Sequence, residues 1–233
     1  MLRKFLFLKK SPNISNSSFR QLWNGPQAEH VRQSQALWKN AVRHVQNHVL
    51  PAVPGFSMEP IWDGVMQIDL SDAVVDEPLL CEDWRNMIIP RDTEFEDSAQ
   101  RVQFIAKART ILDGPERGVK VFSLPRRRDG LSSADFRRHY REVHAELVRR
   151  NAAFREYANR YVQHDVLPES VRSSEGFVPY DGISEFWFDS VDVAKAAWAA
   201  PSYMAELRAD EKTFVGNPPS HRVIIEETII ERV

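Results

Sequence analysis

Apolar and polar positions in the second half of the chain follow two different periods. Residues 119–124 (VKVFSL) and 181–188 (DGISEFWF) are short runs rich in β-branched and aromatic residues, which predicts strands. From residue 136 to 147 apolar side chains recur at helical spacing, which predicts a helix that buries Phe136, Tyr140, Val143 and Leu147. Ser132 and Asp135 resemble a capping box at its start.

Three more elements complete this half. We predict a strand that ends in Val166-Leu167-Pro168, a second helix over residues 191–208 that Pro201 interrupts, and a closing strand over residues 222–230. The resulting order, β-α-β-β-α-β, is that of a ferredoxin-like unit. Such a sheet carries helices on one face and needs a partner to cover the other.

The first half repeats this pattern. Residues 19–51 align with residues 136–168 without a gap, with 14 identities in 33 positions. Gly25-Pro26 should break or kink the first copy's helix. We predict an α+β fold in which two tandem ferredoxin-like units pack sheet to sheet as an intrachain α+β barrel.

A linker divides the two copies. The segment Asp113–Gly118 has two glycines and a proline, so we place an N-terminal unit at residues 1–113 and a C-terminal unit at residues 118–233. The acidic run from Asp69 to Asp97 covers the second helix of the first unit. We interpret it as a solvated face rather than a metal site.

Composition excludes several classes of function. The 31 basic and 33 acidic residues give a net charge of −2 with no basic stripe, which argues against a nucleic-acid partner. No segment approaches the ~20 apolar residues of a membrane helix, and the run Phe5–Leu8 is too short for a signal peptide. With Cys81 as the only cysteine, no disulfide can form within the chain, and we expect a cytoplasmic location.

Cofactor motifs are missing too. The sequence has no G-x-G-x-x-G, no Walker loop, no G-x-S-x-G and no Cys/His cluster with metal-ligand spacing. We therefore expect an enzyme that needs no bound cofactor and no metal.

The predicted helix places His144 at the border of its buried face, with His139 on the opposite flank. A border histidine can reach a cavity and still keep a pKa near neutrality, which suits proton transfer. The alternative is a histidine that only bonds the backbone. The first copy has Gln27 in place of His144 and Trp23 in place of Tyr140.

The next strand should also contribute to a site. Its alternation puts Tyr161, Gln163 and Asp165 on one face, and we expect this more polar face to line the barrel interior. The corresponding residues of the first copy are His44, Gln46 and His48. Two histidines at this spacing could suggest zinc, but no third ligand is evident.

The third strand adds Glu185 and Trp187 on one face, which we assign to the interior. A carboxyl group buried beside an indole has a raised pKa and can serve as an acid. The alternative is a salt bridge to an arginine such as Arg160. Gln67 is the counterpart of Glu185 in the first copy.

The segments LPRRRDGLSSADFRRHYREVHAELV (124–148), YVQ (161–163) and YDGISEFWFDS (180–190) together resemble an EthD domain of the dimeric α+β barrel superfamily. The first half matches this pattern more weakly, since it has Gln27 and Gln67. The resemblance implies a ferredoxin-like fold paired into a barrel with a ligand pocket. It also implies cofactor-free chemistry on aromatic or polyketide-like molecules, with haem in some members.

These observations predict a division of labour between the halves. We expect His144, Tyr161, Asp165 and Glu185 to move protons, and a second set to bind substrate: Tyr140, Gln163, Trp187, Trp23, Gln27, His44 and His48. The predicted reaction is a lyase or isomerase type of elimination on a hydrophobic aromatic compound. The alternatives are a monooxygenase on a phenol, cofactor-free or with haem, and a non-catalytic binding protein. A homodimer beyond the intrachain pair is possible.

Overall fold

The computed structural model describes residues 1–71, 95–173, 180–216 and 220–233. Eight strands form one closed barrel in which every neighbouring pair is antiparallel. The strands are β1 (Leu2–Leu8), β2 (Ala41–Val49), β3 (Gly64–Leu70), β4 (Val102–Leu112), β5 (Val119–Leu124), β6 (Ala158–Val166), β7 (Gly182–Phe188) and β8 (His221–Ile230).

The order around the barrel is β1-β3-β2-β8-β5-β7-β6-β4. The first half thus contributes β4-β1-β3-β2 and the second β8-β5-β7-β6, the same order in each. The halves join twice, where β2 pairs with β8 and where β4 pairs with β6. Closure leaves no edge strand unpaired, which protects the sheet from further strand addition.

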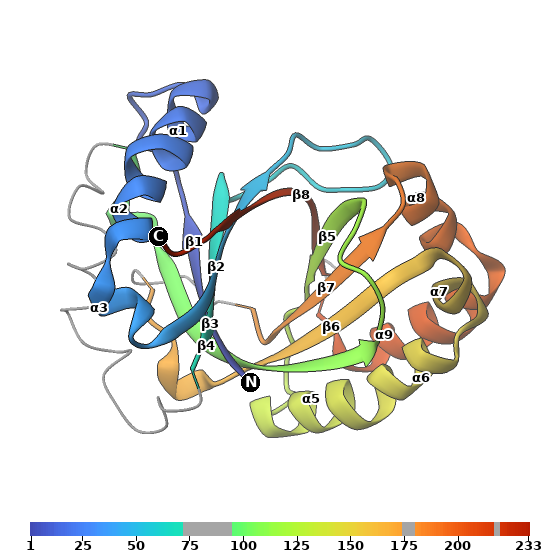
Figure 1. The fold of residues 1–233 in the computed structure, drawn as a ribbon. Coiled ribbons are helices and arrows are strands. Elements are labelled where there is room, and N and C mark those ends of the chain that lie inside the picture. The colour runs from blue at the N-terminus through green and yellow to red at the C-terminus, as the bar shows by residue number, and fades with distance from the viewer. Residues whose placement is uncertain (72–94, 174–179, 217–219) are drawn as a thin grey trace.

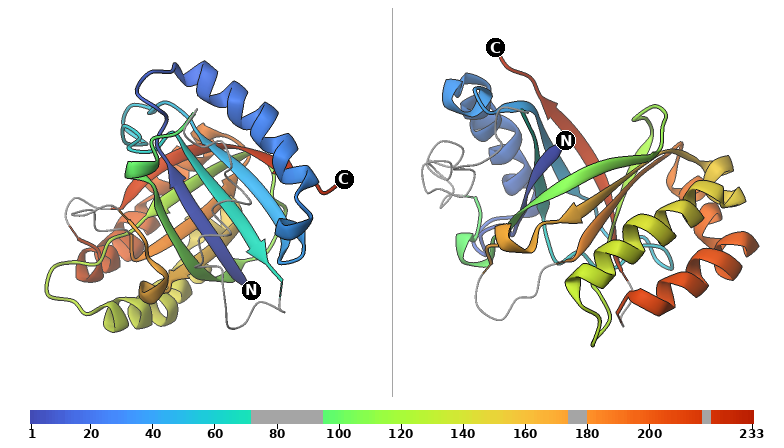
Figure 2. Two further views of the ribbon diagram at one scale, coloured as in Figure 1. Left: turned by 90° about the vertical axis from the view of Figure 1, so that its left-hand side faces the viewer. Right: turned by 90° about the horizontal axis from the view of Figure 1, so that it is seen from below.

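Helices cover the barrel on two opposite sides (Figures 1 and 2). On the first half lie α1 (Asn16–Leu22), a π-helix (Trp23–Gln27), α2 (Ala28–Gln33) and α3 (Gln35–Trp38). The second half carries α5 (Ser133–His139), a π-helix (Tyr140–His144), α6 (Ala145–Arg150), α7 (Ala152–Tyr157), α8 (Val191–Ala199), a third π-helix (Tyr203–Leu207) and α9 (Arg208–Phe214). Short 3₁₀ turns lie at Ser98–Gln100 and Pro168–Ser170.

The predicted element order is present throughout the second half. The Ser132 hydroxyl accepts a hydrogen bond from the Asp135 amide at 3.0 Å, as expected of an N-cap, and the second helix is interrupted before Pro201. The second helix predicted for the first half falls mostly on residues outside the described ones. The two tandem ferredoxin-like units, with their boundaries, therefore stay a prediction.

A π-helix replaces the predicted break at Gly25-Pro26. Both halves contain one at the same place, and only the first contains a proline. In each half a glutamine of the second strand donates to the carbonyl of the π-helix's first residue: Gln46 to Trp23 at 2.9 Å, Gln163 to Tyr140 at 2.8 Å. A buried side chain thus stabilises the wide turn in both halves.

The repeated Asp-Gly motif has a steric cause. A Cβ atom on Gly64 would lie 2.2 Å from the Trp23 ring, and one on Gly182 would lie 2.7 Å from the Tyr140 ring. Each glycine lets a large aromatic side chain of the π-helix lie directly on the strand.

The barrel interior is filled by side chains from both halves. One part is apolar and includes Phe5, Phe7, Phe104, Phe122 and Ile183. Another part is ionic: Glu185 binds Arg3 at 2.9 Å, Lys120 at 2.5 Å and His164 at 2.8 Å. The interior is therefore a packed core rather than a ligand chamber.

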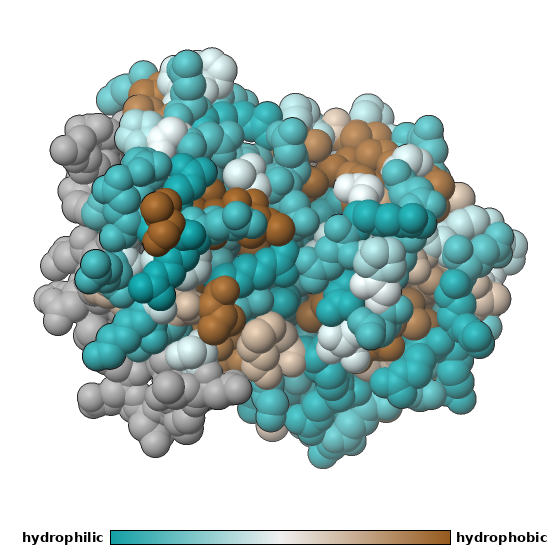
Figure 3. All heavy atoms as spheres, viewed as in Figure 1, coloured by the Kyte–Doolittle hydropathy of each residue, from teal (hydrophilic) through white to brown (hydrophobic). Residues whose placement is uncertain are grey.

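No helix among the described residues is long and apolar enough to cross a membrane. The face in Figure 3 is mainly hydrophilic. One group of apolar atoms lies where the loop between β2 and β3 meets α8, and smaller groups lie over the first half.

Candidate active site

A cleft opens in the helical layer of the second half and leads to a small inner cavity. The outer cleft has a volume of about 510 Å³, and the inner cavity holds about 20 Å³. They share five lining residues: Ser123, Trp198, Tyr203, Glu211 and Ser220. The inner cavity has room for about one water-sized molecule.

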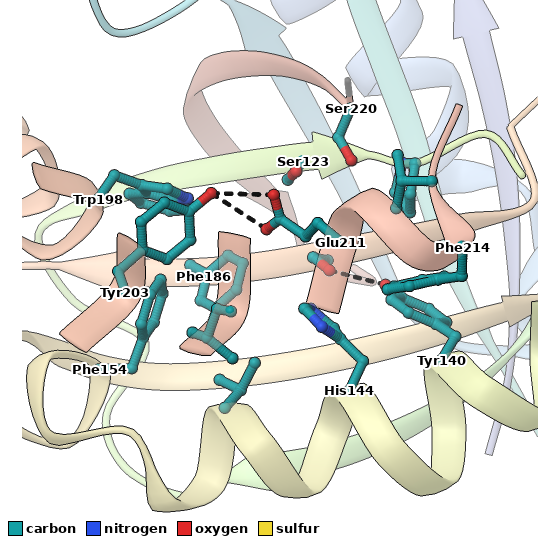
Figure 4. A pocket seen from close by; sticks show the side chains of 15 residues that line it. Ser123, Tyr140, His144, Phe154, Phe186, Trp198, Tyr203, Glu211, Phe214 and Ser220 are labelled. Carbon is teal, nitrogen blue, oxygen red and sulfur yellow. Dashed lines mark hydrogen bonds between the residues drawn. The ribbon is translucent and has the colours of Figure 1, made fainter. Parts of the chain in front are cut away.

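His144 lies at the wall of the inner cavity and points into it (Figure 4). Its Nδ1 is 2.9 Å from Oδ2 of Asp210, and the other oxygen of Asp210 is 2.7 Å from Nε2 of His139. With Nδ1–H donating to the carboxylate, a neutral ring has its lone pair on Nε2. Nε2 has no hydrogen-bond partner among the described residues.

Asp210 remains an anion in this arrangement. Burial alone would raise the pKa of its carboxyl group, but hydrogen bonds from His144 and His139 outweigh burial and lower the pKa below its ordinary value. A carboxylate that holds a histidine ring in one orientation is the arrangement of hydrolase triads. Here it prepares Nε2 of His144 to accept a proton.

The local sequence explains the position of His144. The π-helix over Tyr140–His144 widens the helix so that Tyr140 and His144 stack, with ring centres 6.0 Å apart. Phe214 of α9 packs on the His144 ring at 5.2 Å and leaves the ring little freedom to turn.

Tyr140 lines the inner cavity, and Tyr161, which lines neither the cavity nor the cleft, shares a hydrogen-bond partner with it. Tyr140 and Tyr161 both bond the Ser184 hydroxyl, at 2.7 and 3.2 Å. Burial raises the pKa of Tyr161 to about 12 and raises that of Tyr140 well above its ordinary value. Both phenols therefore stay protonated, and the prediction that Tyr161 moves protons finds no support in its geometry.

Tyr203 and Glu211 separate the cavity from the cleft. The Tyr203 hydroxyl donates to Glu211 at 3.0 and 3.1 Å, and Arg208 pairs with the same carboxylate at 3.0 Å. Figure 4 shows this pair beside the space above His144.

The assignment of the second strand's faces was wrong. Tyr161, Gln163 and Asp165 face the helices, whereas His164, on the opposite face, bonds Glu185 in the barrel. Polar side chains are accommodated under the helices because hydroxyl and carbonyl groups lie there: Gln163 donates to the Tyr140 carbonyl and accepts from Arg109. Burial raises the pKa of Asp165, which lines neither cavity.

Glu185 and Trp187 do face the barrel interior, as predicted, but not as a catalytic acid and wall. Burial opposes ionisation of Glu185, yet Lys120, His164 and Arg3 outweigh burial and hold its pKa well below the ordinary value. The alternative of a salt bridge was nearer the truth, although the partner is Arg3 rather than Arg160. Lys120 lies over the Trp187 ring at 5.0 Å.

The predicted binding residues of the first half lie away from this site. Trp23 and Gln27 are buried residues of the first half's own π-helix, and His44 and His48 face the helices of that half rather than the barrel interior. The His48 Nε2 lies 2.7 Å from the Asn24 side-chain oxygen. Gln67 is in the barrel beside Lys120 and Glu185.

Sequence reasoning missed four contributors: Asp210, Glu211, Arg222 and Phe56. The two acids lie on α9, where consecutive carboxylates look like an ordinary solvated face. Phe56 comes from the loop between β2 and β3 of the first half and lines the outer cleft. No short-range pattern connects these residues to His144.

The residues present do not fit a metal or haem. Among the described residues, no group of three His, Cys, Asp or Glu side chains could hold a metal ion. Haem needs room for a planar macrocycle and an axial ligand. The outer cleft is lined by no histidine or cysteine from the described residues, and the cavity beside His144 is far too small.

Comparisons with known proteins agree with this fold. Residues 128–218 match the family model of the EthD domain, so the predicted resemblance in the second half is confirmed. A search of curated proteins finds no significant match.

Three solved structures share the architecture. An anthrone oxidase-like protein has 13% identity and a TM-score of 0.60, covering 98% of this chain and 92% of its own. A provisionally assigned monooxygenase from Lactobacillus acidophilus NCFM has 9% identity and a TM-score of 0.53 (99% and 96% covered). A provisionally assigned chlorite dismutase has 10% identity and a TM-score of 0.53 (97% and 94%). At these identities the likeness establishes the fold alone.

Proposed function

We propose that this chain, whose second half contains an EthD domain, is a monooxygenase that oxidises an electron-rich phenolic substrate without a bound cofactor, with His144 as general base. The observation that carries the proposal is the His144–Asp210 pair, which presents an unbonded ring nitrogen to a largely enclosed, aromatic-lined cavity.

The first step is removal of a proton from the substrate. A phenol, or the enol form of an aromatic ketone, sits in the outer cleft with its hydroxyl group at the inner cavity. Its proton reaches Nε2 of His144 directly or through the single water for which the inner cavity has room. Asp210 stabilises the imidazolium that forms.

The anion produced is electron-rich enough to react with dioxygen. One electron passes to dioxygen, and the resulting radical and superoxide combine into a carbon peroxide anion. The imidazolium of His144 returns its proton to this anion and gives the hydroperoxide. Loss of the remaining C–H proton and of hydroxide, together one water molecule, leaves a carbonyl group. For a CH₂ group between two aromatic rings the balance is R₂CH₂ + O₂ → R₂C=O + H₂O. The protein supplies only the base and the dry surroundings.

Elimination, the reaction predicted from the sequence, lacks its acid. Glu185 lies on the barrel side of β7 in ion pairs, whereas Ser184 and Phe186 of the same strand line the cavity. Glu211 accepts from Tyr203 and pairs with Arg208, so it is arranged as an acceptor. Oxygenation of a phenolate needs one base that later returns its proton, and no second acid. The names of two structural neighbours, a provisionally assigned monooxygenase and an anthrone oxidase-like protein, support the same choice.

The test is oxygen consumption by the purified protein with anthrone and related hydroxylated aromatics, combined with ¹⁸O₂ labelling. We expect one labelled oxygen atom per product molecule, and no Soret or flavin absorbance. His144→Ala should reduce kcat by roughly 10²–10⁴-fold. Gln27→Ala, at the aligned position of the first half, is the matched control and should leave kcat within about two-fold.

Asp210→Asn tests the positioning of the base. Since the amide can no longer hold Nδ1–H as a carboxylate does, we expect kcat to fall while KM stays close to its original value. Conversion of substrate without uptake of oxygen would support the lyase instead. Binding without any conversion, unchanged in His144→Ala, would indicate a carrier protein.

A further inference from the structure

Arg222 of β8 lies in the wall of the outer cleft and packs against two neighbouring aromatic rings. Its guanidinium carbon is 4.4 Å from the Trp198 ring centre and 5.1 Å from that of Phe56. Its Nη1 donates to the Phe56 carbonyl at 3.1 Å. These contacts fix the plane of the guanidinium group, so its other edge has a defined direction.

The charge of Arg222 is compensated by the protein only in part, since the Tyr203 hydroxyl and Glu211 both favour the cation. No carboxylate of the described residues lies within 4 Å of it, and its Nε is buried without a hydrogen-bond partner among them. Glu211 acts on it only through space and is already bound by Tyr203 and Arg208. Burial lowers the pKa of Arg222, which reflects the cost of keeping this cation partly out of water.

By the register of the barrel, the counterpart of Arg222 in the first half is Gln103. Arg101, which directly precedes β4, nevertheless shows how an arginine of this chain binds an acid. Its Nε donates to Oε2 of Glu96 at 3.3 Å, and its Nη2 pairs with Oε1 of the same carboxylate. This is side-on, two-point pairing through the Nε edge. The Nε edge of Arg222 pairs with no carboxylate of the described residues.

We propose that Arg222, in the wall of the outer cleft, binds a carboxylate group on the aromatic substrate. The site therefore selects aromatic acids over their neutral analogues. This inference rests on the proposed function only in using the same cleft, since binding requires no turnover.

The other charges in the cleft favour an anion as well. Arg208 and Lys195 line the cleft, and Glu211 is the acid that lines it among the described residues. Lys195 is exposed and lies 3.6 Å from Asp192. Its charge is screened by water, so Arg222 should provide most of the selectivity.

The first half contributes directly to this recognition. The loop between β2 and β3 brings Phe56 against Trp198, with ring centres 5.6 Å apart, and the Met58 amide donates to the Arg222 carbonyl. Figure 1 shows this loop reaching across to α8. The N-terminal half thereby forms one wall of a site whose base lies in the C-terminal half.

The experiment compares 3-hydroxy-2-naphthoic acid with its carboxamide, by titration of tryptophan fluorescence at neutral pH, with His144→Ala protein as a non-converting form. We expect the acid to bind the wild-type protein at least ten-fold more tightly. Arg222→Gln should abolish this preference. Arg222→Lys, which keeps the charge but cannot pair side-on, should lose most of it. Lys195→Gln is the matched control and should change the ratio less than two-fold.

Equal binding of acid and amide by the wild-type protein overturns the inference, whether or not the Arg222 variants fold. The inference is also overturned if Arg222→Lys prefers the acid as strongly as the wild-type protein does, because a single positive charge would then be enough for the preference. Selective binding without any oxygen uptake leaves the inference standing and defeats the proposed monooxygenase. Oxygen uptake without a preference for the acid defeats the inference and leaves the proposed monooxygenase standing.

Discussion

His44 makes the stability of this protein depend on pH. The ring lies fully buried between β2 and the first half's helices, and neither ring nitrogen has a hydrogen-bond partner among the described residues. Burial lowers its pKa from 6.5 to about 3. The folded protein thus keeps His44 neutral, whereas the unfolded chain binds a proton near pH 6.5.

The sign and size follow from proton linkage. Because folding lowers the pKa of His44, its contribution to the unfolding free energy is fully present above pH 6.5. This contribution is lost as the pH falls from 6.5 toward 3. Between pH 7 and pH 5, His44 alone should cost about 2 kcal/mol of unfolding free energy. His48 and His164, whose pKa values burial lowers to about 4, should add about as much each. Together about 6 kcal/mol is a large part of the stability of a typical domain.

The measurement is urea unfolding at pH 7 and pH 5, followed by circular dichroism. Between pH 7 and pH 5 the unfolding free energy of His44→Leu should fall by about 2 kcal/mol less than that of the wild-type protein. Val45→Ala, a buried change on the same strand with no titrating group, should lower stability at both pH values equally. If the unfolding free energy of His44→Leu falls by as much between pH 7 and pH 5 as that of the wild type, the His44 ring is not held neutral and the reasoning fails.

Two other changes test the interior and the repeated glycines. Glu185→Gln should destabilise the protein by about 1.5–3 kcal/mol in urea unfolding, because Arg3 and Lys120 each lose one of two carboxylate partners and keep only Asp69 and Glu227; a loss below about 1 kcal/mol would contradict this. Gly64→Ala should lower stability by about 1–3 kcal/mol, since its Cβ would meet the Trp23 ring at 2.2 Å. Gly25→Ala, with no atom within 4 Å of its Cβ, is the control and should not destabilise the protein.

The elements of the second half and their order could be predicted from local pattern. The pattern could not tell which face of a strand lies under the helices and which lies inside the barrel. The period of two correctly groups Gln163 with Tyr161 and His164 with Val162. Both faces of the barrel are covered, so polarity alone cannot say which face meets the helices. Gln163 lies under them because a π-helix there offers a carbonyl, and no single-strand pattern contains that information.

The catalytic pair shows a second limit. His144 stands out by its place on the helix border and by its resemblance to a family motif. Asp210, which orients it, is 66 residues further along the chain and comes close only when α9 packs against the π-helix of Tyr140–His144. Because this contact depends on the angle between two helices, it cannot be deduced from the spacing within either one.

The counterparts of His144 and Arg222 suggest what the duplication achieved. The first half has Gln27 at the position of His144 and, by the register of the barrel, Gln103 at that of Arg222. The second half has an imidazole ring and a cation at these two positions. A neutral amide can replace neither the proposed base nor the proposed cation. The first half has therefore become a structural partner that closes the barrel and lends Phe56 to its neighbour's cleft.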